Sequence, residues 1–324
     1  MAHEEFSIYQ SYQEFLQSDP DMSMPVAAVQ SLVEFIRQSQ ASTMSEFVVM
    51  VRDAAQVLKS SARNSVSLAA GCDLFMQAVT RMADANVEEC RQNLINRGTK
   101  FVEKAASCRE SIAELGEPFI RDDSTILVHS YSRVVMTLLL RAAAHNRRFR
   151  VYVTEARPIN SGYRTAAQLR QAGIPCTVVL DCAVGYIMEE VDFVLVGAEG
   201  VVENGGLINQ IGSYQISIVA KAARKPFYAV AESYKFVRLF PLNQFDLPTH
   251  TAQILSFDSP QSVASPSPSL SDTNSMELDG AALDLAKTNP EVDYTPPSFI
   301  TLLFTDLGVL TPSGVSDELI KLYY

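Results

Sequence analysis

The sequence lacks an excess of positive charge, a long apolar run and the cysteine spacing of a metal site. It has 26 Lys and Arg against 37 Asp and Glu, a net charge of −11, which argues against a general nucleic-acid-binding protein. No apolar run approaches the roughly 20 residues that span a bilayer. The five cysteines show no CxxC spacing. We therefore expect no membrane span, no bound metal and reduced thiols without a disulfide framework.

Targeting and nucleotide-binding signatures are also missing. The chain starts with Met-Ala-His-Glu-Glu-Phe, which does not have the basic-then-apolar order of a signal peptide. No GxGxxG follows the first predicted strand, and GxxxxGK[ST] does not occur. We expect a cytosolic protein with neither a dinucleotide-binding fingerprint nor a P-loop.

Apolar residues recur at helical spacing through the first third of the 324 residues. Thr43 and Glu46 form a capping-box pattern, and Asn86 is a candidate cap for a long helix that Pro118 ends. The first apolar stripe consists of Val26, Val29, Leu32, Val33 and Ile36. This periodicity predicts an all-helical domain over residues 1–123.

Residues 124–324 alternate predicted strands with predicted helices. The strands are Thr125–His129, Phe149–Thr154, Cys176–Leu180, Phe193–Val196, Phe227–Ala231 and Phe299–Phe304. The helices are about Ser132–Ala144, Gly162–Gln171, Ala183–Glu190, Ser213–Ala223 and Val315–Leu322. Near-continuous apolar strands separated by helices are typical of a parallel sheet covered on both faces. The pattern predicts the α/β class.

One segment, residues 256–275, departs from this pattern. Eight of its 20 residues are Ser and three are Pro. Such a composition buries too little apolar surface to offset the entropy lost on ordering. We expect a disordered insertion within the second domain.

Polar side chains gather where the predicted strands end, as ligand-binding residues do at the carboxyl edge of a parallel sheet. The candidate ligand-binding residues are His129, Ser130, Arg133, Glu155, Arg157, Asp181, Glu199, Asn209, Gln210 and Gly212. The Arg157 fork suits a phosphate, and the glycines before Ser213 let backbone N–H groups approach an anion at a helix N-terminus. Two structural alternatives remain, namely a turn cap for Asp181 and a satisfied buried histidine for His129.

Several long blocks identify a family resemblance. They are VHSYSRVV (128–135), DCAVGYIME (181–189), VGAEGVVENGGLINQIG (196–212), VAESYKFVRLFPLNQ (230–244) and FTDLGVLTPSGVSDELIKL (304–322). They resemble the alpha, beta and delta subunit family of eukaryotic translation initiation factor 2B, and its alpha type most. The resemblance implies an N-terminal helical domain followed by a Rossmann-like, doubly wound parallel-sheet domain.

The resemblance also implies a function and partners. The family forms the regulatory core of the guanine-nucleotide exchange factor that recharges initiation factor 2 with GTP, while the epsilon subunit, assisted by gamma, carries out exchange. An alpha-type member pairs with itself and assembles with the beta, gamma, delta and epsilon subunits. It helps sense the phosphorylated alpha subunit of initiation factor 2, which lowers translation initiation under stress.

The same family resemblance extends to sugar-phosphate isomerases. Those enzymes carry Cys where this chain has Ser130, and Asp where it has Glu199. Aldose–ketose isomerisation needs a placed acid/base pair, so both changes argue against this alternative. The enzymes' phosphate-binding motifs resemble Glu155–Pro158 and Asn209–Ser213, although Gln210 replaces a lysine. The resemblance therefore implies no catalytic residue and no cofactor, but an allosteric sugar phosphate or nucleoside phosphate.

Two protein-binding surfaces follow from the resemblance. The segment Asn64–Phe75 resembles the region that faces phosphorylated initiation factor 2, and an ordinary helix–helix contact is the alternative reading of its small residues. Its candidate partner-binding residues are Asn64, Ser65, Ser67, Ala69, Ala70 and Asp73. The aromatic-rich segments Phe236–Phe240 and Phe299–Phe304 are expected to contribute to a homodimer through the C-terminal domain.

Overall fold

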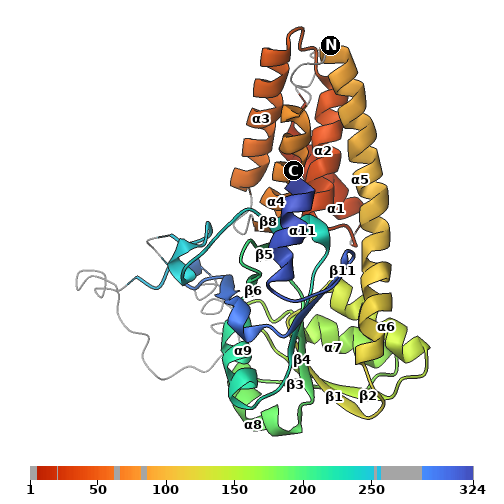
Figure 1. Cartoon of the computed structure of the whole chain (residues 1–324), viewed down its shortest axis with the longest axis vertical. Coiled ribbons are helices and arrows are strands. Elements are labelled where there is room, and N and C mark those ends of the chain that lie inside the picture. Colours follow the sequence, from red (N-terminus) through yellow and green to blue (C-terminus); the bar gives the residue numbers. More distant parts are fainter. Residues whose placement is uncertain are drawn as a thin grey trace, which may run out of the picture.

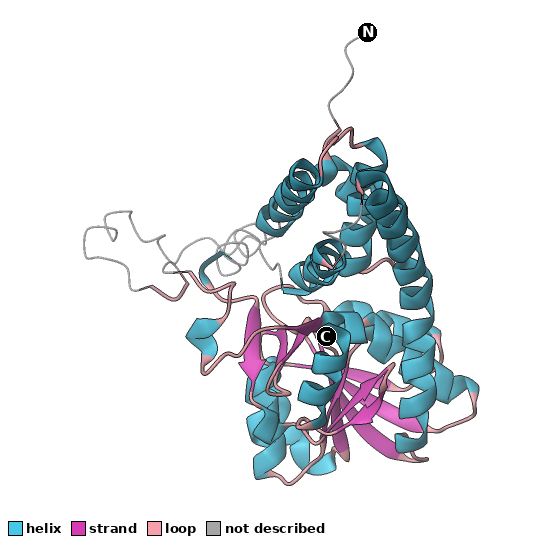
Figure 2. Ribbon diagram, turned by 45° about the horizontal axis from the view of Figure 1, so that its top comes forward, coloured by secondary structure: helices cyan, strands magenta, loops and turns pink. Residues whose placement is uncertain are grey.

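The computed structural model describes residues 6–19, 21–61, 66–81, 86–251, 254–256 and 287–323. A group of helices stands over a domain built on a sheet (Figures 1 and 2). This arrangement confirms the predicted fold class, with helices first and a parallel-rich sheet second. The predicted insertion at 256–275 lies, except for Ser256, outside the described residues. No helix within the described ranges is both long and apolar enough to cross a membrane.

Five helices form the N-terminal domain. They are α1 (Ile8–Ser18), α2 (Met24–Gln38), α3 (Met44–Ser61), α4 (Val66–Thr80) and α5 (Val87–Gly116). The Asn86 side chain accepts a hydrogen bond from the Glu89 N–H at 2.8 Å, which confirms the predicted cap. Helix α1, which begins after Ser7, was not predicted. Its Ile8 and Tyr12 side chains are buried against the core of α2, α3 and α4.

The main sheet has seven strands. They are β1 (Ser124–His129), β2 (Phe149–Thr154), β3 (Cys176–Val179), β4 (Phe193–Val196), β7 (Phe227–Val230), β10 (Leu302–Thr305) and β11 (Gly308–Leu310). Their order is β11-β10-β7-β4-β1-β2-β3, and β11 alone of them runs antiparallel to its neighbour. The parallel strands thus follow the Rossmann order, in which the order of strand addition across the sheet reverses between β1 and β4.

Helices cover both faces of this sheet. One face packs against α6 (Arg133–Ala144), α7 (Gly162–Gln171) and the end of α5. The other packs against α8 (Val184–Ile187), α9 (Ser213–Ala222) and α11 (Gly314–Tyr323). The buried side chains of β1 alternate between these two cores, since successive residues of a strand point to opposite faces.

Two predicted boundaries are wrong. The helix expected over Ala183–Glu190 is interrupted, because short 3₁₀ turns flank the four-residue α8 on both sides. The strand expected from Phe299 begins only at Leu302, because Pro297–Phe299 forms a 3₁₀ turn. Proline has no N–H to donate to a sheet, so it favours such a turn.

A second, smaller sheet was not predicted. It consists of β5 (Gly200–Val202), β6 (Leu207–Gln210), β8 (Phe236–Val237) and β9 (Val292–Thr295), in the order β8-β5-β6-β9. A tight turn at Glu203 and Asn204 joins β5 to β6, and the Asn204 Oδ1 accepts the Gly206 N–H at 2.9 Å. Gly205 has φ +81°, and a Cβ there would lie 2.0 Å from the Pro312 carbonyl oxygen, so the turn requires glycine.

A buried carboxylate joins the two domains. Glu232, which follows β7, lies 3.0 Å from the Lys235 Nζ and 3.5 Å from the Arg109 Nε of α5. Burial acts to raise the pKa of Glu232, but Lys235, a backbone hydrogen bond and Arg109 together outweigh it and hold that pKa below its ordinary value. The neighbouring Tyr234 hydroxyl lies 3.3 Å from the hydroxyl of Ser23 at the start of α2. The helical domain is thus fixed to the carboxyl edge of the sheet.

A second buried carboxylate joins the small sheet to the main one. Asp293 in β9 accepts hydrogen bonds through one oxygen from the N–H groups of Gly212 (2.8 Å) and Tyr214 (3.0 Å). These groups form the N-terminus of α9, where a negative charge is favourable. The other oxygen of Asp293 has no hydrogen-bond partner. Burial raises the pKa of Asp293 to about 7, although the two backbone hydrogen bonds act to lower it.

This environment predicts a pH-dependent stability. Because the folded-state pKa lies above the unfolded value of 3.8, Asp293 favours folding most at low pH, and this contribution is lost as the pH rises through about 7. Asp293→Asn keeps an oxygen for the two N–H groups and has no charge to bury. Its unfolding free energy relative to the wild type should rise by a few kcal/mol between about pH 4 and about pH 7, since one pKa unit is about 1.4 kcal/mol. Urea unfolding across this range measures the difference.

The control is Asp293→Ala, which removes the acceptor. It should cost about 1–2 kcal/mol near neutral pH, as the loss of a helix cap does. A difference between Asp293→Asn and the wild type that stays constant with pH would show that the carboxylate is not held at a raised pKa.

Candidate functional site

The carboxyl edge of the main sheet brings several predicted residues together. Arg157, Asp181 and Gly212 line one cavity of about 580 Å³. Apolar and aromatic side chains of α9 and of the loop after β8 complete it, among them Tyr214, Ile218 and Phe245. The wall is mainly apolar, with the Arg157 guanidinium and with the carboxylates of Asp181 and Asp293, both of which accept backbone N–H groups. The guanidinium suits one anionic group of a ligand that has an apolar body.

Asp181 holds the turn that carries Arg157. Its two carboxylate oxygens accept the backbone N–H groups of Ala156 (2.9 Å) and Arg157 (2.8 Å). These bonds confirm the turn-cap reading of Asp181. The Arg157 side chain is 59% exposed, and its Nε lies 3.5 Å from the buried Glu155 carboxylate. Arg157 is therefore positioned by its backbone while most of its guanidinium faces solvent.

His129 is a satisfied buried histidine. Its Nε2 lies 2.9 Å from the Ile211 carbonyl oxygen, to which it donates, and its Nδ1 lies 2.6 Å from the Thr154 hydroxyl. Burial lowers the pKa of His129, so the ring is neutral. Both nitrogens are engaged, and the ring has no nitrogen left to serve a ligand as a general base.

Ser130 stands in a constrained backbone position. Its φ is +64°, in the left-handed region that is unfavourable for residues other than glycine. The Ser130 hydroxyl is 2.8 Å from that of Ser161, and its carbonyl accepts the Thr165 hydroxyl at 2.8 Å. Such contacts keep the hydroxyl in place but supply no base to activate it.

The remaining predicted ligand-binding residues lie in the small sheet or directly before one of its strands. Glu199 is half-buried just before β5. Asn209 is buried and donates to the Ser213 hydroxyl at 2.9 Å. Gln210 is half-buried, and its buried Nε2 has no hydrogen-bond partner. Asn209 and Gln210 are thus part of the framework before α9 rather than an open ligand surface.

One predicted feature of the rim is wrong. We expected the N–H groups before α9 to be available for an anion, but the Asp293 carboxylate already accepts them. Sequence reasoning missed Asp293 because it lies 81 residues beyond Gly212 along the chain. The strand-forming run Val292–Thr295, read as the partner of Leu207–Gln210, was the signal that points to it.

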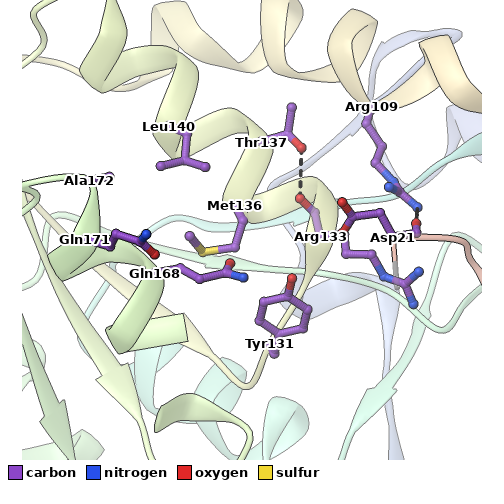
Figure 3. A pocket seen from close by; sticks show the side chains of 10 residues that line it. All are labelled: Asp21, Arg109, Tyr131, Arg133, Met136, Thr137, Leu140, Gln168, Gln171 and Ala172. Atoms are coloured by element: carbon purple, nitrogen blue, oxygen red, sulfur yellow. Dashed lines mark hydrogen bonds between the residues drawn. The ribbon is translucent and has the colours of Figure 1, made fainter. Parts of the chain in front are cut away.

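Arg133 lies apart from the other rim residues. Its guanidinium donates to the Met22 carbonyl of the helical domain and lines a different cavity, of about 420 Å³, at the junction of the two domains (Figure 3). We call this the junction cavity. The structure therefore removes Arg133 from the predicted rim site.

The predicted partner-binding segment is partly buried. Asn64 and Ser65 lie outside the described residues. Ser67 and Ala70 are buried, and helix α4 packs closely on α2, since a Cβ on Gly71 would lie 2.8 Å from the Pro25 oxygen. The expectation that Ser67 and Ala70 face a partner is corrected accordingly. Ala69 is half-buried, and Asp73 is 52% exposed and forms an ion pair with Lys59.

The two segments expected at a homodimer interface contain both buried and exposed aromatic side chains. Phe236 and Phe304 are buried in the cores of the domain. The exposed apolar side chains instead lie in the loop after β8, where Phe240 is 61%, Leu242 79% and Phe245 70% exposed. Of the cysteines, Cys72, Cys90 and Cys108 are buried, whereas Cys182 is exposed. Among the described residues, no group of three or more His, Cys, Asp and Glu side chains is arranged to hold a metal ion.

Comparisons with known proteins agree with this architecture. Residues 17–312 match the Initiation factor 2 subunit family. The chain is 45% identical to the translation initiation factor eIF2B subunit alpha of Dictyostelium discoideum, over 96% of this chain and 95% of that protein. It is 31% identical to the ribose 1,5-bisphosphate isomerase of Archaeoglobus fulgidus, over 88% and 83% of the two chains.

The fold is also similar to that of a solved structure, the tetrameric eIF2B-beta2-delta2 complex from C. thermophilum. The TM-score is 0.73 with 19% identity, and the match covers 98% of this chain and 96% of that one. The family match spans most of the sequence, and the relative from Dictyostelium is similar along nearly its whole length. The chain therefore belongs to the Initiation factor 2 subunit family.

Proposed function

We propose that the chain is a non-catalytic, cytosolic regulatory subunit of the guanine-nucleotide exchange factor that recharges translation initiation factor 2 with GTP. The observation that carries the proposal is the 45% identity to an eIF2B subunit alpha over almost the full length of both chains. The partners would be the beta, gamma, delta and epsilon subunits and a second copy of this chain.

The chemistry of the rim supports the absence of catalysis. Ser130, which the sequence resemblance matches to the isomerases' cysteine, has a hydroxyl partner in Ser161 but no base, and His129 has both ring nitrogens engaged. Isomerisation needs a group that takes a proton near one carbon and returns it near the next. Similarity to archaeal ribose 1,5-bisphosphate isomerases makes that reaction the second candidate. Turnover of ribose 1,5-bisphosphate by the purified chain would favour it.

The exposed edge of α4 is the part of the predicted segment that remains available to phosphorylated initiation factor 2. Asp73 is the exposed acid of this edge, and Ala69 lies one helical turn before it. Residues four apart on a helix lie on the same side. The buried Ser67 and Ala70 would support this edge from below by packing on α2 and on the small sheet.

Charge reversal at α4 tests the sensing role. Asp73→Lys should weaken inhibition by the phosphorylated factor, because it changes the charge of the contact surface without disturbing the core beneath. The loss should correspond to about 1–3 kcal/mol of coupling, the usual range for allosteric linkage. Nucleotide exchange on the reconstituted complex is measured with and without the phosphorylated factor, each variant against its own uninhibited rate.

The matched control is Glu189→Lys, which makes the same charge change on an exposed residue beside α8, at the end of the molecule opposite the N-terminal helices (Figure 1). It should leave inhibition unchanged. Full inhibition of the Asp73→Lys complex would remove this edge of α4 from the mechanism.

Self-association would use the exposed apolar loop after β8. Phe240, Leu242 and Phe245 expose large apolar surfaces within six residues, and apolar, aromatic-rich patches are typical of the centre of an interface. Leu242→Glu should convert a dimer to a monomer at micromolar concentration, as measured by light scattering. Tyr186→Glu, on α8 and also highly exposed, should not. The reverse result would locate the interface at α8.

The cavity of about 580 Å³ at the carboxyl edge of the main sheet is called the rim cavity. It is proposed to bind a sugar phosphate or nucleoside phosphate, with the phosphate at Arg157 and the body against the apolar wall near Tyr214 and Phe245. Arg157→Ala should weaken binding of adenosine monophosphate roughly 10–150-fold, because it removes a charge-assisted contact of about 1.5–3 kcal/mol. Isothermal calorimetry measures the two affinities. Equal affinities would mean that the nucleotide binds elsewhere.

A further inference from the structure

The junction cavity differs in chemistry from the rim cavity. Asp21 and Arg109 line it from the helical domain, while Tyr131 and Arg133 line it from the sheet domain. Helices α6 and α7 complete its wall with Met136, Thr137, Leu140, Gln168, Gln171 and Ala172. In Figure 3 the two guanidinium groups lie at one end of the cavity beside Asp21, and the two glutamine amides lie away from them. The cavity therefore has a charged end and a polar, uncharged end.

The arginines already hold the loop between α1 and α2. Arg109 donates to the Asp21 carbonyl at 2.7 Å, and Arg133 donates to the adjacent Met22 carbonyl. A guanidinium carries five N–H donors, so these bonds leave further donors on both groups. Since one arginine belongs to α5 and the other to α6, a single anion between them would contact both domains.

The charges around this end of the cavity favour an anion. Arg164 does not line the cavity, but it stacks on the ring of Tyr131, which does, with its guanidinium 3.9 Å from the ring centroid. Of the nearby carboxylates, Asp21 lines the cavity, while the buried Glu232 is shared between the Lys235 Nζ at 3.0 Å and the Arg109 Nε at 3.5 Å. With Lys235 included, four cationic side chains stand against these two carboxylates.

We propose that the junction cavity binds a small phosphate ester, with its phosphate between Arg109 and Arg133 and its hydroxyl-bearing body against Tyr131, Gln168 and Gln171. Paired guanidinium groups are suited to phosphate oxygens because they donate parallel hydrogen bonds. The volume of about 420 Å³ leaves room for a body beyond the phosphate. The ligand stabilises the docking of the two domains, because its phosphate is shared between them.

The test compares glycerol 3-phosphate, inorganic phosphate and glycerol as probes of the full chain by isothermal calorimetry. Glycerol 3-phosphate should bind saturably and more tightly than inorganic phosphate, and glycerol should not bind. Arg133→Gln keeps a donor for the Met22 carbonyl and removes the charge, so it should weaken the ester about tenfold or more. Arg147→Gln, on an exposed arginine that does not line the cavity, should leave this affinity unchanged. Arg157→Ala reports on any binding at the rim. Melting temperatures with and without the ester report on domain docking.

Both the comparison of probes and the comparison of variants can contradict the proposal. No saturable binding of glycerol 3-phosphate, or weakening by Arg157→Ala and not by Arg133→Gln, would exclude the junction cavity. Equal affinity for inorganic phosphate and the ester would mean an anion site without a site for the body. If Arg133→Gln does not fold, Tyr131→Phe and Gln168→Ala replace it, since both leave the arginines and their carbonyl contacts intact. Unchanged affinity in both would contradict the proposed binding mode.

Discussion

Two carboxylates from within the chain occupy the backbone N–H groups at the carboxyl edge of the sheet. Asp181 fixes the turn that carries Arg157, and Asp293 fixes the start of α9. Both perform the task that an anionic ligand performs at many helix and turn N–H groups. The edge is therefore held without a ligand, and the small sheet is anchored to the main one by the same contact.

This arrangement determines where positive charge remains available. At the rim it is largely the exposed guanidinium of Arg157, beside a mainly apolar wall. At the junction of the domains it is the pair Arg109 and Arg133, which contact consecutive carbonyls of one loop. The buried Glu232 with Arg109 and Lys235 connects the junction to the end of β7. Binding at the junction would thus act on the relation between the domains, which is a regulatory rather than a catalytic arrangement.

The sequence was sufficient for the fold class and for most elements of the main sheet, because their apolar strands and amphipathic helices carry local periodic signals. The small sheet was missed because β5, β6 and β8 are only two to four residues long, and β9 joins them only across a long insertion. Asp293 was missed for the same reason. Arg133 was a predicted ligand-binding residue, but its place beside Arg109 was not predicted. Arg109 and Arg133 meet through the packing of α5 on α6, which no local pattern encodes.

The partner-binding surface also could not be predicted from local sequence patterns. The small residues of Asn64–Phe75 predicted a close approach correctly, but in the described part of this segment the approach is to α2 and not to another protein. Helical spacing cannot tell these two partners apart, whereas burial of Ser67 and Ala70 does.

The most direct test of the regulatory role is guanine-nucleotide exchange on initiation factor 2 by the complex reconstituted with and without this chain. The account predicts that both complexes exchange nucleotide, and that phosphorylated initiation factor 2 inhibits strongly only the complex that contains the chain. Equal inhibition of both complexes, or loss of all exchange when the chain is omitted, would contradict it.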